Sequence, residues 1–217
     1  MSTLHFPVQA LSRLYYIVDP MCSWCYAFTQ CWSELQQVLP EQMQTTYVLG
    51  GLAPDTTESM PEEMRKMIQH TWQKIETMVP GVHFNYDFWA CNTPMRSTYP
   101  ACRAVLAASK QKPDAGLKML QAIQQAYYQH AKNPSLIGTL QECAEIIGLN
   151  GAQFASDLSS KYIEETLKHE LETAAKLQAF SFPSLRLVHE DELYPITIDY
   201  LDHQKMLNEI NTVINRG

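Results

Sequence analysis

Two cysteines, Cys22 and Cys25, lie three positions apart, directly after a short run of β-branched and aromatic residues. On a helix this spacing brings both sulfur atoms to one face, close enough to form a disulfide with little backbone movement. Cys22 would begin that helix, where unpaired N–H groups and the helix dipole favour a thiolate. Cys25 would lie one turn further in and be less exposed. The arrangement predicts dithiol exchange, in which Cys22 attacks a sulfur atom and Cys25 resolves the mixed disulfide.

A pair of cysteines at this spacing is also compatible with half of a zinc site, to which His83 or Cys91 would add a ligand. Structural zinc sites usually contain a second close pair of ligands, and the histidines of this chain show no such spacing. Redox use is favoured because the motif follows a strand and opens a helix. A non-catalytic zinc or protein-binding module stays open as an alternative.

The other four cysteines are interpreted as small buried apolar residues: Cys31, Cys91, Cys102 and Cys143. Cys91 and Cys102 are also candidates for a second redox pair, and the sequence leaves their distance open. Asp19 stands between the apolar run and the dithiol. It is either a proton acceptor for the resolving thiol or, as aspartates more often do, it ends the strand.

The elements that position the dithiol are predicted from hydrophobic patterns. Residues 14–18 and 45–49 are typical of buried strands, and apolar residues recur at helical spacing over 22–39. The first fifty residues therefore predict a strand–helix–strand unit with two parallel strands. Near the end of the chain, residues 184–188 and 194–198 flank a turn and predict an antiparallel hairpin, followed by a helix over 201–214.

Between these halves the pattern is helical. Helices are predicted over 61–79, 99–110, 114–131, 135–147 and 159–178. The first has an apolar stripe that includes Met64 and Met67 and predicts a face in the core. We therefore expect an α/β fold in three segments: 1–58 and 159–217 form the α/β domain, and 59–158 form a helical insertion.

The composition agrees with a globular protein that has a sizeable core, since 46% of its 217 residues are hydrophobic and 18% are charged. No apolar run reaches the ~18–20 residues of a membrane span, so we expect no membrane partner. The formal net charge of −7 disfavours nucleic acid as a partner. Residues 1–12 lack the basic and apolar segments of a secretory signal, which predicts a cytoplasmic protein with reduced thiols.

The order of these elements resembles the DsbA-like branch of the thioredoxin superfamily, in which a helical insertion divides a thioredoxin-like fold. Asp19-Pro20, Trp24-Cys25-Tyr26, Asn92-Thr93 and the segment from Tyr99 to Arg103 are similar to its FrnE-like subgroup of disulfide isomerases. The resemblance implies that Cys22 is the nucleophile and Cys25 the resolving cysteine. It also implies a cis Phe182–Pro183 bond beside the nucleophilic sulfur, which accounts for a proline at the start of a strand.

The implied activity is that of a protein-disulfide oxidoreductase or isomerase. Pro183 would hold the substrate chain at the sulfur, and we expect the apolar side chains of Trp24 and Phe182 to contact the substrate as well. Substrates would be proteins or small molecules that carry a thiol or a disulfide. No bound cofactor is expected, and glutathione is a candidate redox partner. Ser23-Trp24 between the cysteines carries no cation to stabilise a thiolate, so we expect a less oxidising couple than that of DsbA.

The same fold is also used by glutathione-dependent enzymes, namely kappa-class transferases and 2-hydroxychromene-2-carboxylate isomerases. These enzymes typically have a serine at the position of Cys22. Both cysteines are present in this chain, which favours disulfide exchange, although a fold alone does not decide a function. The direction of electron flow, the physiological substrate and the oligomeric state stay open at this stage.

Overall fold

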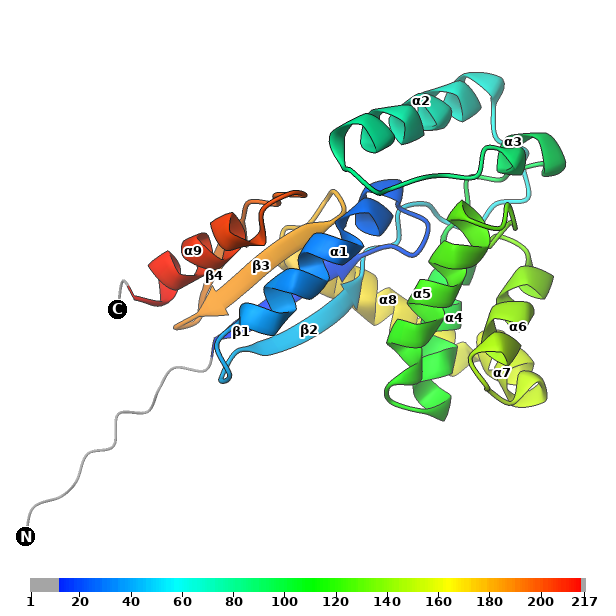
Figure 1. Cartoon of the computed structure of the whole chain (residues 1–217). Coiled ribbons are helices and arrows are strands. Elements are labelled where there is room, and N and C mark those ends of the chain that lie inside the picture. The colour runs from blue at the N-terminus through cyan, green and yellow to red at the C-terminus, as the bar shows by residue number, and fades with distance from the viewer. Residues whose placement is uncertain (1–11, 216–217) are drawn as a thin grey trace, which may run out of the picture.

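The computed structural model describes residues 12–215 and contains one four-stranded mixed sheet (Figure 1). Its strands are β1 (Arg13–Val18), β2 (Gln44–Leu49), β3 (Ser184–His189) and β4 (Glu192–Ile196), in the order β2-β1-β3-β4. β1 pairs with β2 in parallel, and β3 pairs with β1 and β4 in antiparallel orientation. The predicted parallel pair and the predicted hairpin are therefore confirmed. The pairing of β1 with β3 joins the two ends of the chain.

Helices cover both faces of this sheet. α1 (Ser23–Val38) and α9 (His203–Ile214) pack on the face that carries Leu14 and Leu187. α8 (Lys161–Lys176) packs on the opposite face, against Ile17 and Val48. Because side chains alternate along a strand, β1 contributes to the core on both sides. The fold is thioredoxin-like, as expected.

A block of helices connects β2 to α8 and lies beside the sheet (Figure 1). Its members are α2 (Glu62–Met78), α3 (Asp87–Cys91), α4 (Tyr99–Gln111), α5 (Ala115–Tyr128), α6 (Ile137–Ile146) and α7 (Gly151–Leu158). The sequence analysis missed α3 and α7, which are too short to show a repeated apolar pattern. The two segment boundaries, at 58/59 and 158/159, stay a prediction, and their outer ends at residues 1–11 and 216–217 lie outside the described residues.

The core of this insertion is aromatic. Trp72 is fully buried, and the rings of Phe84, Phe88, Trp89 and Tyr128 surround it. The predicted apolar stripe on α2 is only partly correct, because the Met67 side chain is 58% exposed. The aromatic rings fill the interface that α2 makes with α3 and α5. Met67, five residues before Trp72, lies on another side of α2 and is left at the surface. Within residues 12–215, no helix combines the length and the apolar character that a membrane span requires.

Candidate functional site

Cys22 is the N-cap residue of α1, as the sequence predicts. Its main-chain N–H donates to the oxygen of Asp19 at 3.1 Å, and its own oxygen accepts the first helical hydrogen bond, from Tyr26, at 3.0 Å. No side chain caps this helix, so no side-chain acceptor competes for the N–H groups of its first turn, where the helix dipole favours negative charge. The residue is 6% exposed. This is the setting in which a cysteine is activated as a nucleophile.

Cys25 lies one turn further along α1 and is fully buried. Burial raises the pKa of its thiol well above the ordinary value, and the neighbouring Cys22 raises it further. Cys25 is therefore a protonated thiol in the reduced protein. Both cysteines are free thiols, so the structure corresponds to the reduced dithiol.

Phe182 and Pro183 lie beside the dithiol. The Phe182–Pro183 peptide bond is cis, in agreement with the resemblance. The Cys22 Sγ donates to the main-chain oxygen of Phe182 at 3.3 Å. The Phe182 ring lies over Gly50, at the end of β2, in the space that a Cβ atom would occupy. Phe182, before β3, therefore contacts both the Cys22 sulfur and the end of β2.

Trp24 is half-buried, and its ring packs on Tyr200 with 5.0 Å between the ring centroids. Tyr200 lies between β4 and α9 and was not identified from the sequence. Tyr200 also packs against the core cluster that contains Cys22 and Cys25, and burial raises the pKa of its phenol. The two rings form one apolar wall of the site. No local sequence signal marked Tyr200, because a loop brings it to the dithiol from the other end of the chain.

Asp19 is fully buried, and it does more than end strand β1, because its carboxylate also accepts several hydrogen bonds. Its carboxylate accepts hydrogen bonds from the main-chain N–H groups of Met21, at 2.8 Å, and Leu52, at 2.6 Å. Thr98 and Cys102 of the helical insertion also donate to it. Asp19 therefore holds the turn that leads into α1 together with the loop after β2. The sequence placed Asp19 near the dithiol but had no signal for its partners in the insertion.

The other cysteines divide into buried and exposed positions. Cys31, Cys102 and Cys143 are buried, as predicted, whereas Cys91 is exposed. The expectation for Cys91 is therefore wrong, because it is the last residue of the short helix α3, whose buried face is formed by Phe88 and Trp89. Among residues 12–215, no three histidine, cysteine, aspartate or glutamate side chains are grouped in a way that could hold a metal ion.

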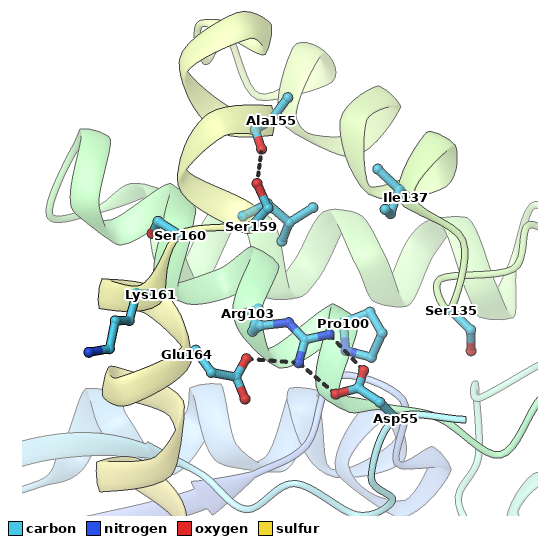
Figure 2. A pocket seen from close by; sticks show the side chains of 11 residues that line it. Asp55, Pro100, Arg103, Ser135, Ile137, Ala155, Ser159, Ser160, Lys161 and Glu164 are labelled. Carbon is cyan, nitrogen blue, oxygen red and sulfur yellow. Dashed lines mark hydrogen bonds and ion pairs between the residues drawn. The ribbon is translucent and has the colours of Figure 1, made fainter. Parts of the chain in front are cut away.

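A cavity of about 750 Å³ lies in the helical part of the molecule and not at the dithiol (Figure 2). It is bordered by α4, α7 and the first turn of α8. Arg103 lies at its base, where its guanidinium pairs with Asp55 and Glu164. None of the five predicted site residues lines it.

Comparison with known proteins assigns this chain to a family. The sequence matches the family described as thioredoxin over residues 15–207. The ClpXP adapter protein SpxH of Bacillus subtilis is 27% identical over 188 residues, which are 83% of this chain and 60% of that protein. The SpxH protein of Halalkalibacterium halodurans is 25% identical over 176 residues, which are 79% of this chain and 57% of that protein. The chain thus spans about three fifths of the length of these curated relatives.

Solved structures show the same fold. A candidate protein disulfide isomerase from Nitrosomonas europaea superposes with a TM-score of 0.81 and 24% identity, over 95% of this chain and 99% of that chain. The cytosolic disulfide reductase DsbM from Pseudomonas aeruginosa superposes with a TM-score of 0.73 and 20% identity, over 94% of this chain and 100% of that chain. The protein described here belongs to the thioredoxin family, and its fold is that of the DsbA-like branch.

Proposed function

We propose that this protein is a thiol:disulfide oxidoreductase or isomerase that acts through the motif Cys22-Ser23-Trp24-Cys25. The observation that carries the proposal is the different position of the two sulfur atoms. Cys22 lies at an uncapped helix N-terminus, and Cys25 is a buried thiol one turn away. A nucleophile and a resolving group are thus held on one face of one helix.

The exchange proceeds in two steps. The Cys22 thiolate attacks one sulfur of a substrate disulfide, forms a mixed disulfide, and releases the other sulfur as a thiolate. Cys25 then loses its proton, and its sulfur attacks the Cys22 sulfur, which forms the Cys22–Cys25 disulfide and releases the second substrate thiolate. Two electrons pass from the dithiol to the substrate. The same steps in reverse oxidise a substrate dithiol.

Trp24, Phe182 and Pro183 are proposed to bind the substrate next to the sulfur. Trp24 and Tyr200 supply an apolar wall, and the Phe182 oxygen lies 3.3 Å from the Cys22 Sγ. A substrate chain in this position would meet main-chain groups on one side and aromatic rings on the other. The substrate class is a protein or small molecule with a thiol or disulfide. We propose glutathione as a redox partner and the cytoplasm as the compartment, which agrees with the cytosolic reductase among the similar structures.

A second candidate function is protein binding without redox chemistry. Its support is the name of the curated relatives, ClpXP adapter protein. An adapter would keep its partner affinity after both cysteines are replaced by serine, whereas the oxidoreductase would lose its activity. The glutathione-dependent transferase remains the alternative within the enzymes, and it would tolerate the loss of Cys25 but not of Cys22.

A redox titration in glutathione buffers tests the proposal, with Trp24 fluorescence as the reporter. The variants Cys22→Ser and Cys25→Ser serve as controls. A reversible two-electron transition that both variants lack supports dithiol exchange, and its midpoint separates a reductase from an oxidase. The absence of a transition, or a titration that stops at a stable adduct of Cys22 with glutathione, would overturn it.

A further inference from the structure

The cavity of about 750 Å³ in the helical part of the molecule is separate from the dithiol (Figure 2). Its volume lies within the range of ~300–1,000 Å³ that is typical of small-molecule sites. Residues of α4, α6, α7 and the first turn of α8 line it, together with Asp55 of the loop after β2. Neither Cys22 nor Cys25 is among them, so a ligand in this cavity would not contact the sulfur atoms.

The walls of the cavity carry apolar side chains. Pro100 lines it from α4, Ala155 and Leu158 from α7, and Ile137 from the start of α6. The Ile137 side chain is 60% exposed, which is unusual for a large apolar residue at the wall of a cavity. A ligand that covers these groups would remove apolar surface from water, which is favourable. The walls therefore fit an apolar ligand body.

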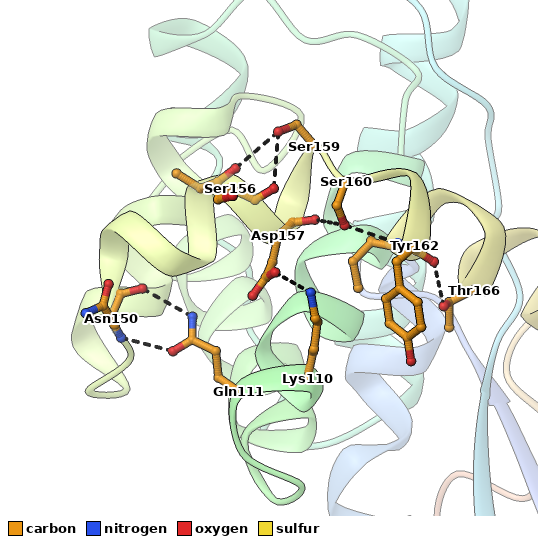
Figure 3. Close-up of polar contacts among 11 residues, drawn as sticks. Lys110, Gln111, Asn150, Ser156, Asp157, Ser159, Ser160, Tyr162 and Thr166 are labelled. Carbon is orange, nitrogen blue, oxygen red and sulfur yellow. Dashed lines mark hydrogen bonds and ion pairs between the residues drawn. The ribbon is translucent and has the colours of Figure 1, made fainter.

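The hydroxyl groups on the same walls already donate to the chain. Ser135 donates to the main-chain oxygen of Ser97 at 2.8 Å. Ser159 and Ser160, between α7 and α8, donate to main-chain oxygens of α7 (Figure 3). Their protons are thus committed to the fold, and the walls offer a ligand few donors. Polar recognition is left to the base of the cavity.

The base consists of Arg103 and two carboxylates. The Arg103 side chain is 16% exposed and donates to both carboxylate oxygens of Asp55, at 2.8 and 2.6 Å, and to the Glu164 Oε2 at 3.3 Å. A guanidinium has five N–H groups, and these bonds use three of them. Within residues 12–215, no hydrogen bond uses the other two N–H groups or the Glu164 Oε1. Donors and an acceptor are therefore available side by side.

The charged side chains that line the cavity sum to zero, since Arg103 and Lys161 are cations and Asp55 and Glu164 are anions. A ligand carboxylate at the base would meet two carboxylates, and a ligand ammonium would meet the guanidinium; both contacts are unfavourable. A primary amide carries no charge, its oxygen accepts hydrogen bonds, and its NH₂ group donates them. An amide therefore matches the donors and the acceptor of the base.

We propose that this cavity binds a small uncharged amphipathic molecule, with its apolar body against Ile137, Ala155 and Leu158 and an amide group at the base. The amide oxygen accepts from the Arg103 guanidinium, and the amide NH₂ group donates to the Glu164 carboxylate. The inference goes beyond the proposed function and does not depend on it, because none of the predicted site residues lines the cavity.

The test is a calorimetric titration of the full chain at pH 7 with three probes that share one apolar chain: octanamide, octanoate and octylamine. Octanamide should bind about tenfold more tightly than either charged probe, because only the charged probes meet a like charge at the base. Its affinity should exceed that of hexanamide by up to about fourfold for each added CH₂ group. Equal affinities for the three head groups would overturn the inference.

Ala155→Trp fills the cavity and should abolish the binding of octanamide. Ala152→Trp is the matched control, since this exposed position on the same helix does not line the cavity, and it should bind like the wild type. Unchanged binding by Ala155→Trp would place the ligand elsewhere and overturn the inference.

Glu164→Gln tests the head group and decides the question if Ala155→Trp does not fold, because the Glu164 side chain is 63% exposed and its replacement leaves the core intact. The substitution removes one negative charge from the base and keeps an acceptor. The preference for octanamide over octanoate should therefore fall by about threefold or more. An unchanged preference would show that the base does not contact the head group and would overturn the inference.

Discussion

The aromatic ring of Phe182 packs directly on the backbone of Gly50, and the two residues close the site from opposite sides of β1. Gly50 follows β2, and Phe182 precedes β3 with its main-chain oxygen on the Cys22 sulfur. Any side chain at position 50 would have to displace the ring. The contact therefore links the edge strand of the sheet to the group that meets the nucleophile.

Replacement of Gly50 by alanine should impair both stability and exchange. The new methyl group would force the Phe182 ring away, at a cost of about 1–3 kcal/mol in the free energy of unfolding. It would also move the Phe182 oxygen relative to Cys22, so oxidation by glutathione disulfide should slow. Gly138→Ala is the matched control, because no atom lies near its Cβ position and alanine is the better helix former. Wild-type exchange rates in Gly50→Ala would contradict the assigned contact.

Replacement of Lys110 by methionine should destabilise the insertion. The Asp157 side chain is 4% exposed. Burial raises the pKa of its carboxyl, but the hydrogen bonds from Lys110 and Gln153 and the charge of Lys110 together hold this pKa below the ordinary value of 3.8. The variant leaves a buried carboxylate without its cation and should lose about 1–3 kcal/mol in urea unfolding at pH 7.

The loss of stability caused by Lys110→Met should depend on pH. A lowered pKa contributes stability above pH 3.8 that disappears as the pH falls through the folded-state value, so the wild type and Lys110→Met should converge in acid. Lys118→Met is the control, since Lys118 and Asp114 are both exposed, and it should unfold like the wild type. Equal effects of the two substitutions would show that the buried pair is not stabilising.

Glu170 should make stability fall with rising pH. Its carboxylate accepts the Leu49 N–H at 2.9 Å at the end of β2, and burial raises its pKa above the ordinary value of 4.5 despite that hydrogen bond. The folded state therefore holds the proton more tightly than the unfolded chain. The resulting stability is complete below pH 4.5 and is lost as the pH rises through the folded-state pKa.

Glu170→Gln isolates this contribution, because its amide oxygen still accepts the Leu49 N–H but does not titrate. As the pH rises from acid to neutral, the melting temperature of Glu170→Gln should increase relative to that of the wild type. A difference that does not change with pH would rule out Glu170 as the titrating group.

Alkylation of the native reduced protein should distinguish the cysteines. Cys91 is exposed, and Cys22, although only 6% exposed, lies at the helix N-terminus, so both should react with iodoacetamide before unfolding. The other four thiols are buried without such activation and should react only in denaturant: Cys25, Cys31, Cys102 and Cys143. Mass spectrometry of the labelled peptides would give the order in which the cysteines react. Rapid native labelling of Cys25 or Cys102 would contradict the burial of these thiols.

The amino-acid sequence by itself determined most helices and all four strands of the described residues, and the place of the dithiol at the start of a helix. Strand and helix patterns are local, so the apolar run ending at Val18 and the helical spacing after Cys22 were sufficient to predict the start of α1. The parallel pairing of β1 and β2 followed from the helix between them. A resemblance to a known branch was needed for the cis bond before Pro183, because most X–Pro bonds are trans.

Only the tertiary structure decided what surrounds the sulfur atoms. The contact of Cys22 with Phe182 joins residues 160 positions apart, and the hydrogen bond of Thr98 to Asp19 joins residues 79 apart. Such contacts depend on how helices pack against the sheet, and no local pattern encodes that packing. The same reason explains the exposure of Met67, which an apolar stripe assigned to the interior, and of Cys91, which its residue type assigned there.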